Sequence, residues 1–257
     1  MLKIMADKFS SNNSSQYDQY LRKIWVLKSW DDGSIYQSFS FIITEIKDGL
    51  IVGKISPFSI AEPDVYFKNF KLSNTSGILF GRINNSLAKC YLSDRSGIIG
   101  NMDLILKEKN EIEAAISEYK SEANKNDIVL EGIYTFRPYK LSDIKFFSKI
   151  KKLTFSVDLN SWGRVNFVSG EISTGKGAVP AAFLTNDQDE IFYCFKCDFE
   201  FNSRIADVTV RDINNDGLKD VVISTAYMNQ QFFYLRWIFL QKDNGYFYDT
   251  SRDAKSV

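Results

Sequence analysis

The chain has 257 residues, 44% of them hydrophobic and 15% aromatic, enough to bury one long domain or two modules of about 120 residues. Lysine plus arginine and aspartate plus glutamate both number 32, and this balance argues against nucleic acid as a partner. Histidine is absent, which excludes Ser-His-Asp triads, Cys-His pairs and the usual zinc hydrolase sites.

Residues 1–21 are predicted to be a flexible leader. Residues 10–15 are a run of serine and asparagine, and the segment has no apolar core of signal-peptide length. Further along, no stretch approaches the roughly 18 consecutive apolar residues of a membrane-crossing helix. We therefore expect no transmembrane segment.

Residues 22–137 are predicted to form an antiparallel β-meander, closed as a barrel or folded as a sandwich. Short apolar segments alternate with turn signals such as Asp48-Gly49 and Asn84-Asn85. Within a segment, apolar residues recur at every second position. Residues 111–119 fit either a helical stripe or a strand face, and the turn signal before them favours a strand. About seven strands at roughly ten-residue spacing suit a barrel or a sandwich.

Residues 138–257 are predicted to form a second β-rich module. Ser142 is a good N-cap, so a short helix is expected over residues 142–150. Residues 232–239 are apolar on both faces, which favours a central strand over an aromatic platform for sugar or peptide. The predicted strands are 153–159, 164–172, 179–185, 191–201, 206–211, 218–226 and 232–241.

The motif that points to chemistry is residues 212–220, Asp-Ile-Asn-Asn-Asp-Gly-Leu-Lys-Asp. A hard cation such as Ca²⁺ takes six to eight oxygen ligands, and alternate positions of a tight turn can supply them. Gly217 permits the positive φ that the reversal needs. The oxygen donors at loop positions 1, 3, 5, 7 (a main-chain carbonyl) and 9 are Asp212, Asn214, Asp216, Leu218 and Asp220.

The residues around the loop predict strands and exclude an EF-hand. An EF-hand carries glutamate at position 12, where this chain has Ile223, and the flanking segments are rich in β-branched residues. The alternative to a metal loop is a plain Asn-Asp-Gly turn whose acids face water. No second copy of the motif occurs, so a propeller built from its repeats is excluded.

With its Asp-x-Asx-x-Asp-Gly-x-x-Asp pattern, the loop resembles the FG-GAP/VCBS class of calcium loops, as in integrin-type propellers. Residues 130–139 and 162–171 are also similar to bacterial proteins described as VCBS repeat-containing, which have no established activity. The resemblance implies a structural Ca²⁺ ion bound by the five donors above. Asn214 stands where many members have aspartate, which implies weaker binding.

Two further polar features are interpreted as structural. The acidic run 186–190 lacks a glycine and lies between predicted strands, so it is expected to be a hairpin loop. Cys194 and Cys197 have zinc-like spacing, but Cys90 is the only other soft ligand, and a structural zinc needs four. Buried thiols are therefore expected at these cysteines.

The sequence favours a non-catalytic, calcium-binding bacterial protein, secreted or in the cell envelope, with an unknown protein or glycan as partner. The extracytoplasmic location is inferred because weak calcium loops suit the millimolar calcium outside cells. Two alternatives are a partner-neutralising protein, such as an immunity protein or inhibitor, and a carboxylate-dependent glycan hydrolase. The first predicts an exposed aromatic patch, and the second predicts two facing acids in a cleft.

Overall fold

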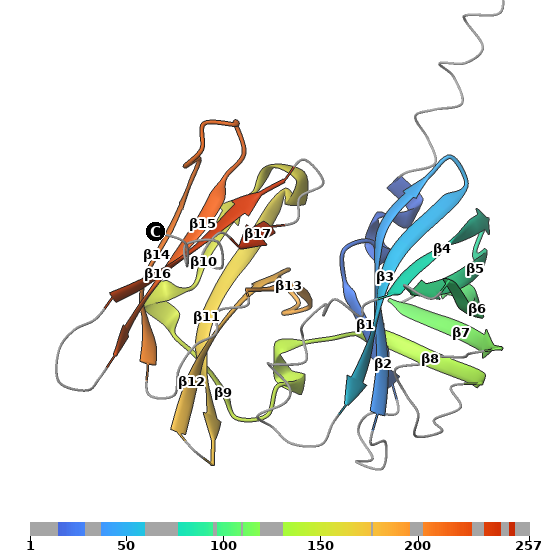
Figure 1. Cartoon of the computed structure of the whole chain (residues 1–257), viewed down its shortest axis with the longest axis horizontal. Helices are drawn as coiled ribbons and strands as arrows, with labels where there is room; N and C mark the ends of the chain where they lie inside the picture. Colours follow the sequence, from blue (N-terminus) through green and yellow to red (C-terminus); the bar gives the residue numbers. More distant parts are fainter. Residues whose placement is uncertain are drawn as a thin grey trace, which may run out of the picture. The chain divides into compact units, whose positions relative to one another are not determined.

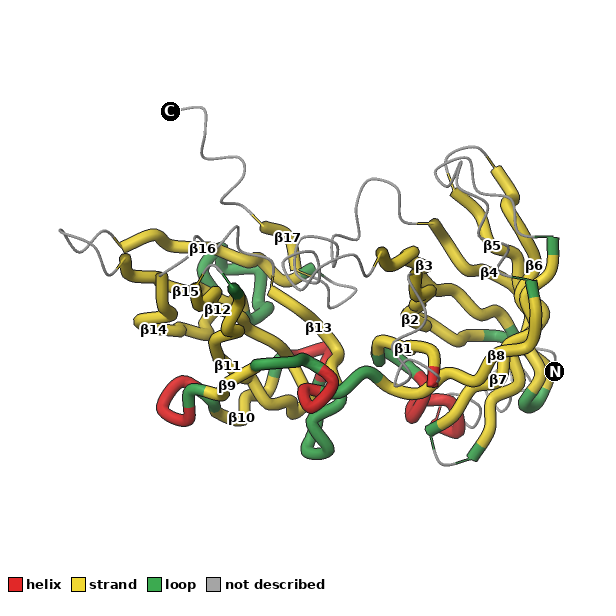
Figure 2. Tube along the Cα trace, turned by 90° about the horizontal axis from the view of Figure 1, so that it is seen from below, coloured by secondary structure: helices red, strands yellow, loops and turns green. Residues whose placement is uncertain are grey.

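The computed structural model divides the chain into two compact units, Met1–Tyr139 and Lys140–Val257 (Figure 1). Both units are built from antiparallel strands, and the described residues contain no α-helix, so the prediction of a mainly β protein is confirmed (Figure 2). No helix among these residues is long and apolar enough to cross a membrane. The described residues are 15–28, 37–59, 77–94, 97–108, 110–118, 131–175, 177–195, 203–227, 234–242 and 247–249.

Eight strands of the first unit form a closed barrel in which each strand pairs with the next and β1 pairs with β8. Of the two architectures that the sequence allowed, the barrel is therefore the one adopted. The ambiguous segment 111–119 contains a strand, as predicted. The strands are β1 (Ile24–Leu27), β2 (Gln37–Lys47), β3 (Leu50–Ser59), β4 (Gly77–Asn84), β5 (Leu87–Asp94), β6 (Gly97–Lys107), β7 (Glu111–Ser117) and β8 (Gly132–Pro138).

The barrel interior is filled by side chains, because alternate residues of each strand point inward. Trp25 stacks on Phe41 with ring centroids 6.4 Å apart, and Phe41 meets Phe136 edge to face at 4.9 Å. All three side chains are fully buried. The indole N–H of Trp25 donates to the main-chain oxygen of Tyr20 at 3.1 Å, so the one polar atom of this ring cluster is satisfied.

Residues 15–21, predicted as part of the leader, belong to the barrel. They include the 3₁₀ helix η1 (Ser15–Tyr20), and the Tyr20 ring is buried against Trp25. The Tyr20 hydroxyl donates to the Lys107 carbonyl at 2.8 Å, and the Tyr17 hydroxyl donates to the Asn85 carbonyl at 2.8 Å. The leader therefore does not extend to residue 21, and residues 1–14 lie outside the described residues.

The second unit consists of two antiparallel sheets with a hydrophobic core between them. One sheet has the order β10-β11-β12-β13, with β9 also paired to β11, and the other has the order β14-β15-β16-β17. Phe195 from the first sheet meets Phe239 from the second at 5.1 Å. The strands are β9 (Phe147–Lys149), β10 (Phe155–Asp158), β11 (Arg164–Thr174), β12 (Gly177–Thr185), β13 (Ile191–Phe195), β14 (Ser203–Arg211), β15 (Asp220–Tyr227), β16 (Tyr234–Gln241) and β17 (Phe247–Asp249).

All seven strands predicted for this half are present, and β16 is a central strand as expected. The apolar run 232–239 therefore contributes a strand between β15 and β17 over its described part, residues 234–239. Residues 232–233 and residues 196–201 of the predicted strand 191–201 lie outside the described residues.

The prediction of a helix over residues 142–150 is wrong. The chain forms the one-turn 3₁₀ helix η3 (Leu141–Asp143) and then β9. The Asp143 carboxylate accepts from the main-chain N–H of Lys140 at 2.8 Å, which closes the turn at its start. Phe146 then has a φ of 60°, which interrupts any right-handed helix, and β9 pairs with β11 instead. Strand pairing outweighs the local capping signal.

The alternation of the barrel wall can be tested with two neighbouring residues of β4. Leu79 is fully buried, so Leu79→Ala is expected to lower the free energy of unfolding by about 2–5 kcal/mol. Ile78 is 52% exposed, and Ile78→Ala is expected to lower it by less than about 1 kcal/mol. Urea denaturation of both variants measures the difference. Equal losses would contradict the inward and outward assignment of this strand.

Candidate functional site

The predicted metal loop joins β14 to β15, and it is the orange bend between them in Figure 1. Arg211 and Asp220 are paired across the two strands and close the base of the loop. Asn215 and Gly217 have φ values of 59° and 83°, in the left-handed region that a tight reversal uses. The strands expected on both sides of the loop are present.

The carboxylates at the loop tip cap main-chain N–H groups of the loop itself. Asp212 accepts from the N–H groups of Asp216, at 3.2 Å, and Gly217, at 2.9 Å. Asp216 in turn accepts from the N–H of Leu218 at 2.9 Å. The side-chain amide of Asn214 donates to the second oxygen of Asp216 at 2.8 Å. These turn-forming contacts are typical of Asp and Asn, and they fold the side chains toward the inside of the bend.

Asp220 is fully buried, and both of its carboxylate oxygens accept a main-chain hydrogen bond. One oxygen accepts from the N–H of Ile213 at 2.8 Å, within the loop. The other accepts from the N–H of Gln241 at 2.9 Å, at the end of β16. Charge-assisted bonds of this kind offset the cost of removing a carboxylate from water. Asp220 therefore connects the loop to the next strand of the sheet.

A residue distant in sequence clamps the loop from the other side. Asn160 begins the 3₁₀ helix η5 (Asn160–Trp162) with a φ of 44°. Its side-chain oxygen accepts from the N–H of Lys219 at 2.9 Å, and its side-chain amide donates to the Gly217 carbonyl at 3.3 Å. The Lys219 ammonium also donates to the Asp158 carbonyl at 2.8 Å. Sequence reasoning missed this contact, because no local pattern links two segments that lie 59 residues apart.

The five predicted donors fit a hard cation, because all of them offer oxygen and none is a thiol or imidazole. The structure places them in one loop of nine residues. Their carboxylates are engaged with the main chain, and no three acidic, cysteine or histidine side chains of the described residues are gathered as metal ligands. Hydrogen bonds of these side chains hold the loop in its bend.

The second acidic run, residues 186–190, is a hairpin loop between β12 and β13, as predicted. Its carboxylates are used in local contacts. Asp187 accepts from the side-chain amide of Asn166 at 3.0 Å, and Asp189 lies 3.1 Å from the ammonium of Lys149. Glu190 is buried and accepts from the side-chain amide of Asn186 at 2.7 Å.

The described cysteines, Cys90 and Cys194, are buried thiols, as expected. Cys90 lies inside the barrel and Cys194 on β13, while Cys197 lies outside the described residues. Burial, with a smaller contribution from the charge of Asp103, raises the pKa of the Cys90 thiol to about 12. The nucleophilic thiolate is therefore scarce at neutral pH.

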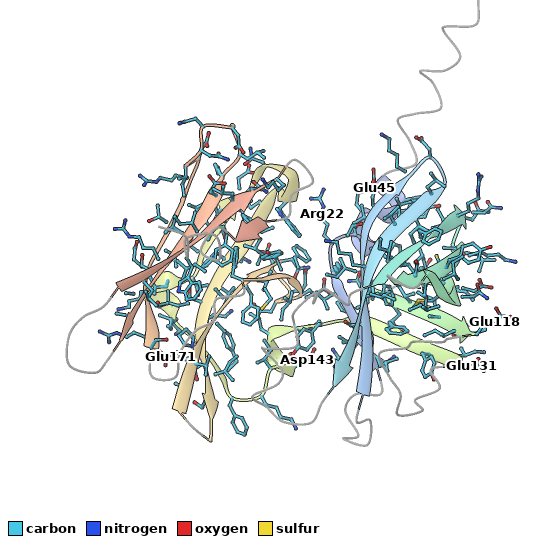
Figure 3. All side chains as sticks on the ribbon, viewed as in Figure 1. Arg22, Glu45, Glu118, Glu131, Asp143 and Glu171 are labelled. Carbon is cyan, nitrogen blue, oxygen red and sulfur yellow. The ribbon has the colours of Figure 1, made fainter. Side chains whose placement is uncertain are left out.

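Two glutamates approach each other at one end of the barrel. Glu118 and Glu131 are labelled at that end in Figure 3. The main-chain N–H of Glu118 donates to the Glu131 carboxylate at 3.1 Å, and the Glu118 carboxylate accepts from the Asn101 side chain at 2.9 Å. Both glutamates are exposed, so they do not form the enclosed acid pair that a glycan hydrolase needs.

The outer wall of the barrel carries an apolar patch on three neighbouring strands. Val52, Phe80 and Tyr91 are cross-strand neighbours on β3, β4 and β5, and the Phe80 and Tyr91 rings are 5.7 Å apart. Ile78 lies on the same outward face of β4. All four side chains are exposed, with Tyr91 at 48%. Grouped exposed apolar residues are less common on protein surfaces than single ones.

Comparison with protein-family models, with curated proteins and with solved structures found no match to this chain. The fold and the loop therefore define the molecule at the level of a class: a mainly β protein with an N-terminal eight-stranded barrel and two further antiparallel sheets.

The Asn160 clamp predicts a difference between two substitutions. Asn160→Ala removes both side-chain hydrogen bonds and places alanine at a φ of 44°, so the free energy of unfolding should fall by about 1–3 kcal/mol. Asn160→Gly removes the same bonds without the backbone cost, and an intermediate loss is expected. Urea denaturation with a metal chelator present measures both. If the glycine variant is as stable as the parent chain, the clamp contributes nothing.

Proposed function

We propose that this chain is a non-catalytic binding module whose β14–β15 loop is stabilised by a structural Ca²⁺ ion. The ion would be held by Asp212, Asn214, Asp216, Asp220 and the main-chain carbonyl of Leu218. The observation that carries the proposal is the placement of these donors in a strand-loop-strand turn that two distant segments anchor. An anchored loop loses little conformational freedom when it takes up a ligand.

The charge of the loop supports a cation. Three carboxylates lie within nine residues and repel one another, and Ca²⁺ would offset that repulsion. The hydrogen bond from Asn214 to Asp216 would be replaced, since both side chains would turn their oxygens to the ion. Binding to the folded state alone adds about 2.7 kcal/mol of stability when the free ion is at a hundred times its dissociation constant.

The setting that suits such a loop is outside the cytoplasm. Asn214 in place of an acid lowers the charge of the donor set, so binding in the range of extracellular calcium is expected. The proposed location of this chain is therefore outside the cytoplasm, as a secreted or cell-envelope protein of a bacterium, and its proposed partner is a protein or a glycan. The equal numbers of acidic and basic residues do not favour nucleic acid.

A second candidate function is neutralisation of a partner protein, as by an immunity protein or inhibitor. The observation in its favour is the exposed apolar patch on β3, β4 and β5, centred on Phe80 and Tyr91. Aromatic residues grouped on a surface are typical of the centre of a protein interface. This function does not require calcium, which separates it from the first.

The proposal is tested by calcium titration calorimetry, with thermal melts, on the parent chain and on Asp216→Ala. We expect one saturable site for the parent chain, a higher melting temperature with calcium, and loss of both in the variant. Asp187→Ala is the matched control, because it removes an acid from the other acidic loop of the same unit. The control should bind calcium as the parent chain does.

Two results would contradict the proposal. If the parent chain binds no calcium at millimolar concentrations, residues 212–220 are a hydrogen-bonded turn, and the partner-neutralising function becomes the leading one. If Asp216→Ala binds calcium as tightly as the parent chain and Asp187→Ala do, the ion is held outside residues 212–220.

A further inference from the structure

The outward face of β14, β15 and β16 carries a groove of about 220 Å³ next to the candidate metal loop. Its floor is apolar and half-buried, its sides carry two hydroxyl groups, and charged residues stand at its ends. The lining residues are Asp207, Thr209, Arg211, Ile213, Val222, Ser224, Arg236 and Ile238. They come from neighbouring strands because the register places Thr209 beside Val222 and Val222 beside Ile238.

Two arginines give this groove its positive charge. Arg211 and Arg236 are exposed, and among the described residues neither guanidinium makes a hydrogen bond or an ion pair. A guanidinium presents five N–H donors in a planar fork that matches a carboxylate. Arginine side chains beside an apolar floor are also typical of protein interfaces.

One acid opposes these charges. Asp207 lies in the same cross-strand row as Ser224 and Arg236, and its carboxylate accepts from the Thr209 hydroxyl at 3.2 Å. It makes no ion pair with Arg236. The lining therefore has two positive charges and one negative charge, and the groove favours an anionic occupant.

We propose that this groove is a docking surface for an extended acidic segment of a partner protein, whose carboxylates pair with Arg211 and Arg236. The proposal rests on the binding part of the function proposed above and does not require the calcium ion. Charge complementarity identifies the occupant. The two guanidinium groups have no partner among the described residues and call for two carboxylates, and the apolar floor suits the side chains between them.

The spacing of the arginines sets the length of that segment. Their cross-strand partners on β15, Asp220 and Ser224, are four residues apart, and β14 and β16 lie on either side of β15. Strand geometry therefore puts the two arginine Cα atoms about 16 Å apart. Both side chains can reach inward, so carboxylates two to four residues apart on an extended chain can meet both guanidinium groups.

One residue, Ile213, belongs to both the groove and the candidate metal loop. Ile213 lines the groove and also donates its N–H to the Asp220 carboxylate at 2.8 Å. Arg211 immediately precedes Asp212, the first predicted donor. A more ordered loop would therefore hold this end of the groove in place, and acidic peptides should bind with calcium at least as tightly as without it.

Fluorescence anisotropy of labelled peptides tests the proposal. The probe is a peptide in which glutamate alternates with serine, and its control has glutamine in place of every glutamate. We expect the acidic peptide to bind and the glutamine peptide not to bind. The double variant Arg211→Ala/Arg236→Ala should bind the acidic peptide at least about tenfold more weakly than the parent chain. Arg204→Ala removes the same charge from β14 outside the groove and should change the affinity by less than about twofold.

Asp207→Asn keeps the size of the side chain and removes the opposing negative charge, so the acidic peptide should bind this variant more tightly. A misfolded variant would bind the peptide more weakly, so tighter binding cannot result from misfolding. Each measurement is made with calcium and with a chelator. If the chain binds the acidic peptide but takes up no calcium in the calorimetric titration, the docking proposal stands and the calcium proposal fails. Three results would overturn the docking proposal: no binding of the acidic peptide, equal losses in the groove and Arg204 variants, or tighter binding of an oligosaccharide of hexuronic acids than of the peptide.

Discussion

The buried carboxylate of Asp220 is the constraint on which the second sheet and its loop depend. A carboxylate out of contact with water must have hydrogen-bond donors, and Asp220 has one from the loop, at Ile213, and one from β16, at Gln241. Gln241 extends the connection, since its side-chain amide donates to the Leu159 carbonyl beside Asn160 at 3.2 Å. Three segments far apart in the sequence therefore meet around one residue.

This arrangement determines what the loop can do. Asn160 fixes one side of the bend and Asp220 fixes its end, so the tip is presented on a frame that the hydrophobic core supports. The acids at the tip are left exposed. In the proposed calcium-bound state, the sheet would keep its arrangement, and the loop would form one end of the groove on the outward face of the same strands. The proposed metal site and the proposed docking surface thus depend on the same buried residues.

Much of this structure could be predicted from the sequence because its signals are local. The hairpin turns of the barrel place Asp48, Asn85 and Asn110 at positive φ, which Asp and Asn tolerate, and the strands between them show alternating apolar residues. The loop between β14 and β15 could also be predicted, because its Asp, Asn and Gly residues are a local signal. The helix over residues 142–150 was predicted wrongly because a cap signal is also local, whereas the pairing of β9 with β11 is not.

Contacts between distant segments could not be predicted. Asn160 is 59 residues from Lys219, and nothing in either segment indicates the other. The groove depends on the register of three strands, in which Asp207, Ser224 and Arg236 share a row. Barrel closure likewise depends on β1 meeting β8. Sequence patterns predict the strands and the candidate oxygen donors. Strand register and packing determine which residues contact one another.

A two-dimensional ¹H–¹⁵N NMR spectrum, recorded with and without calcium, tests directly whether residues 212–220 bind Ca²⁺. The side-chain amide of Asn214 donates to Asp216 in this structure, and Ca²⁺ binding would break that bond. Calcium binding at this loop should produce large shifts for this amide and for the main-chain N–H groups of Ile213 and Gly217, with the signals of the barrel unchanged. A spectrum in which the signals of residues 212–220 do not respond to millimolar calcium would contradict calcium binding at this loop.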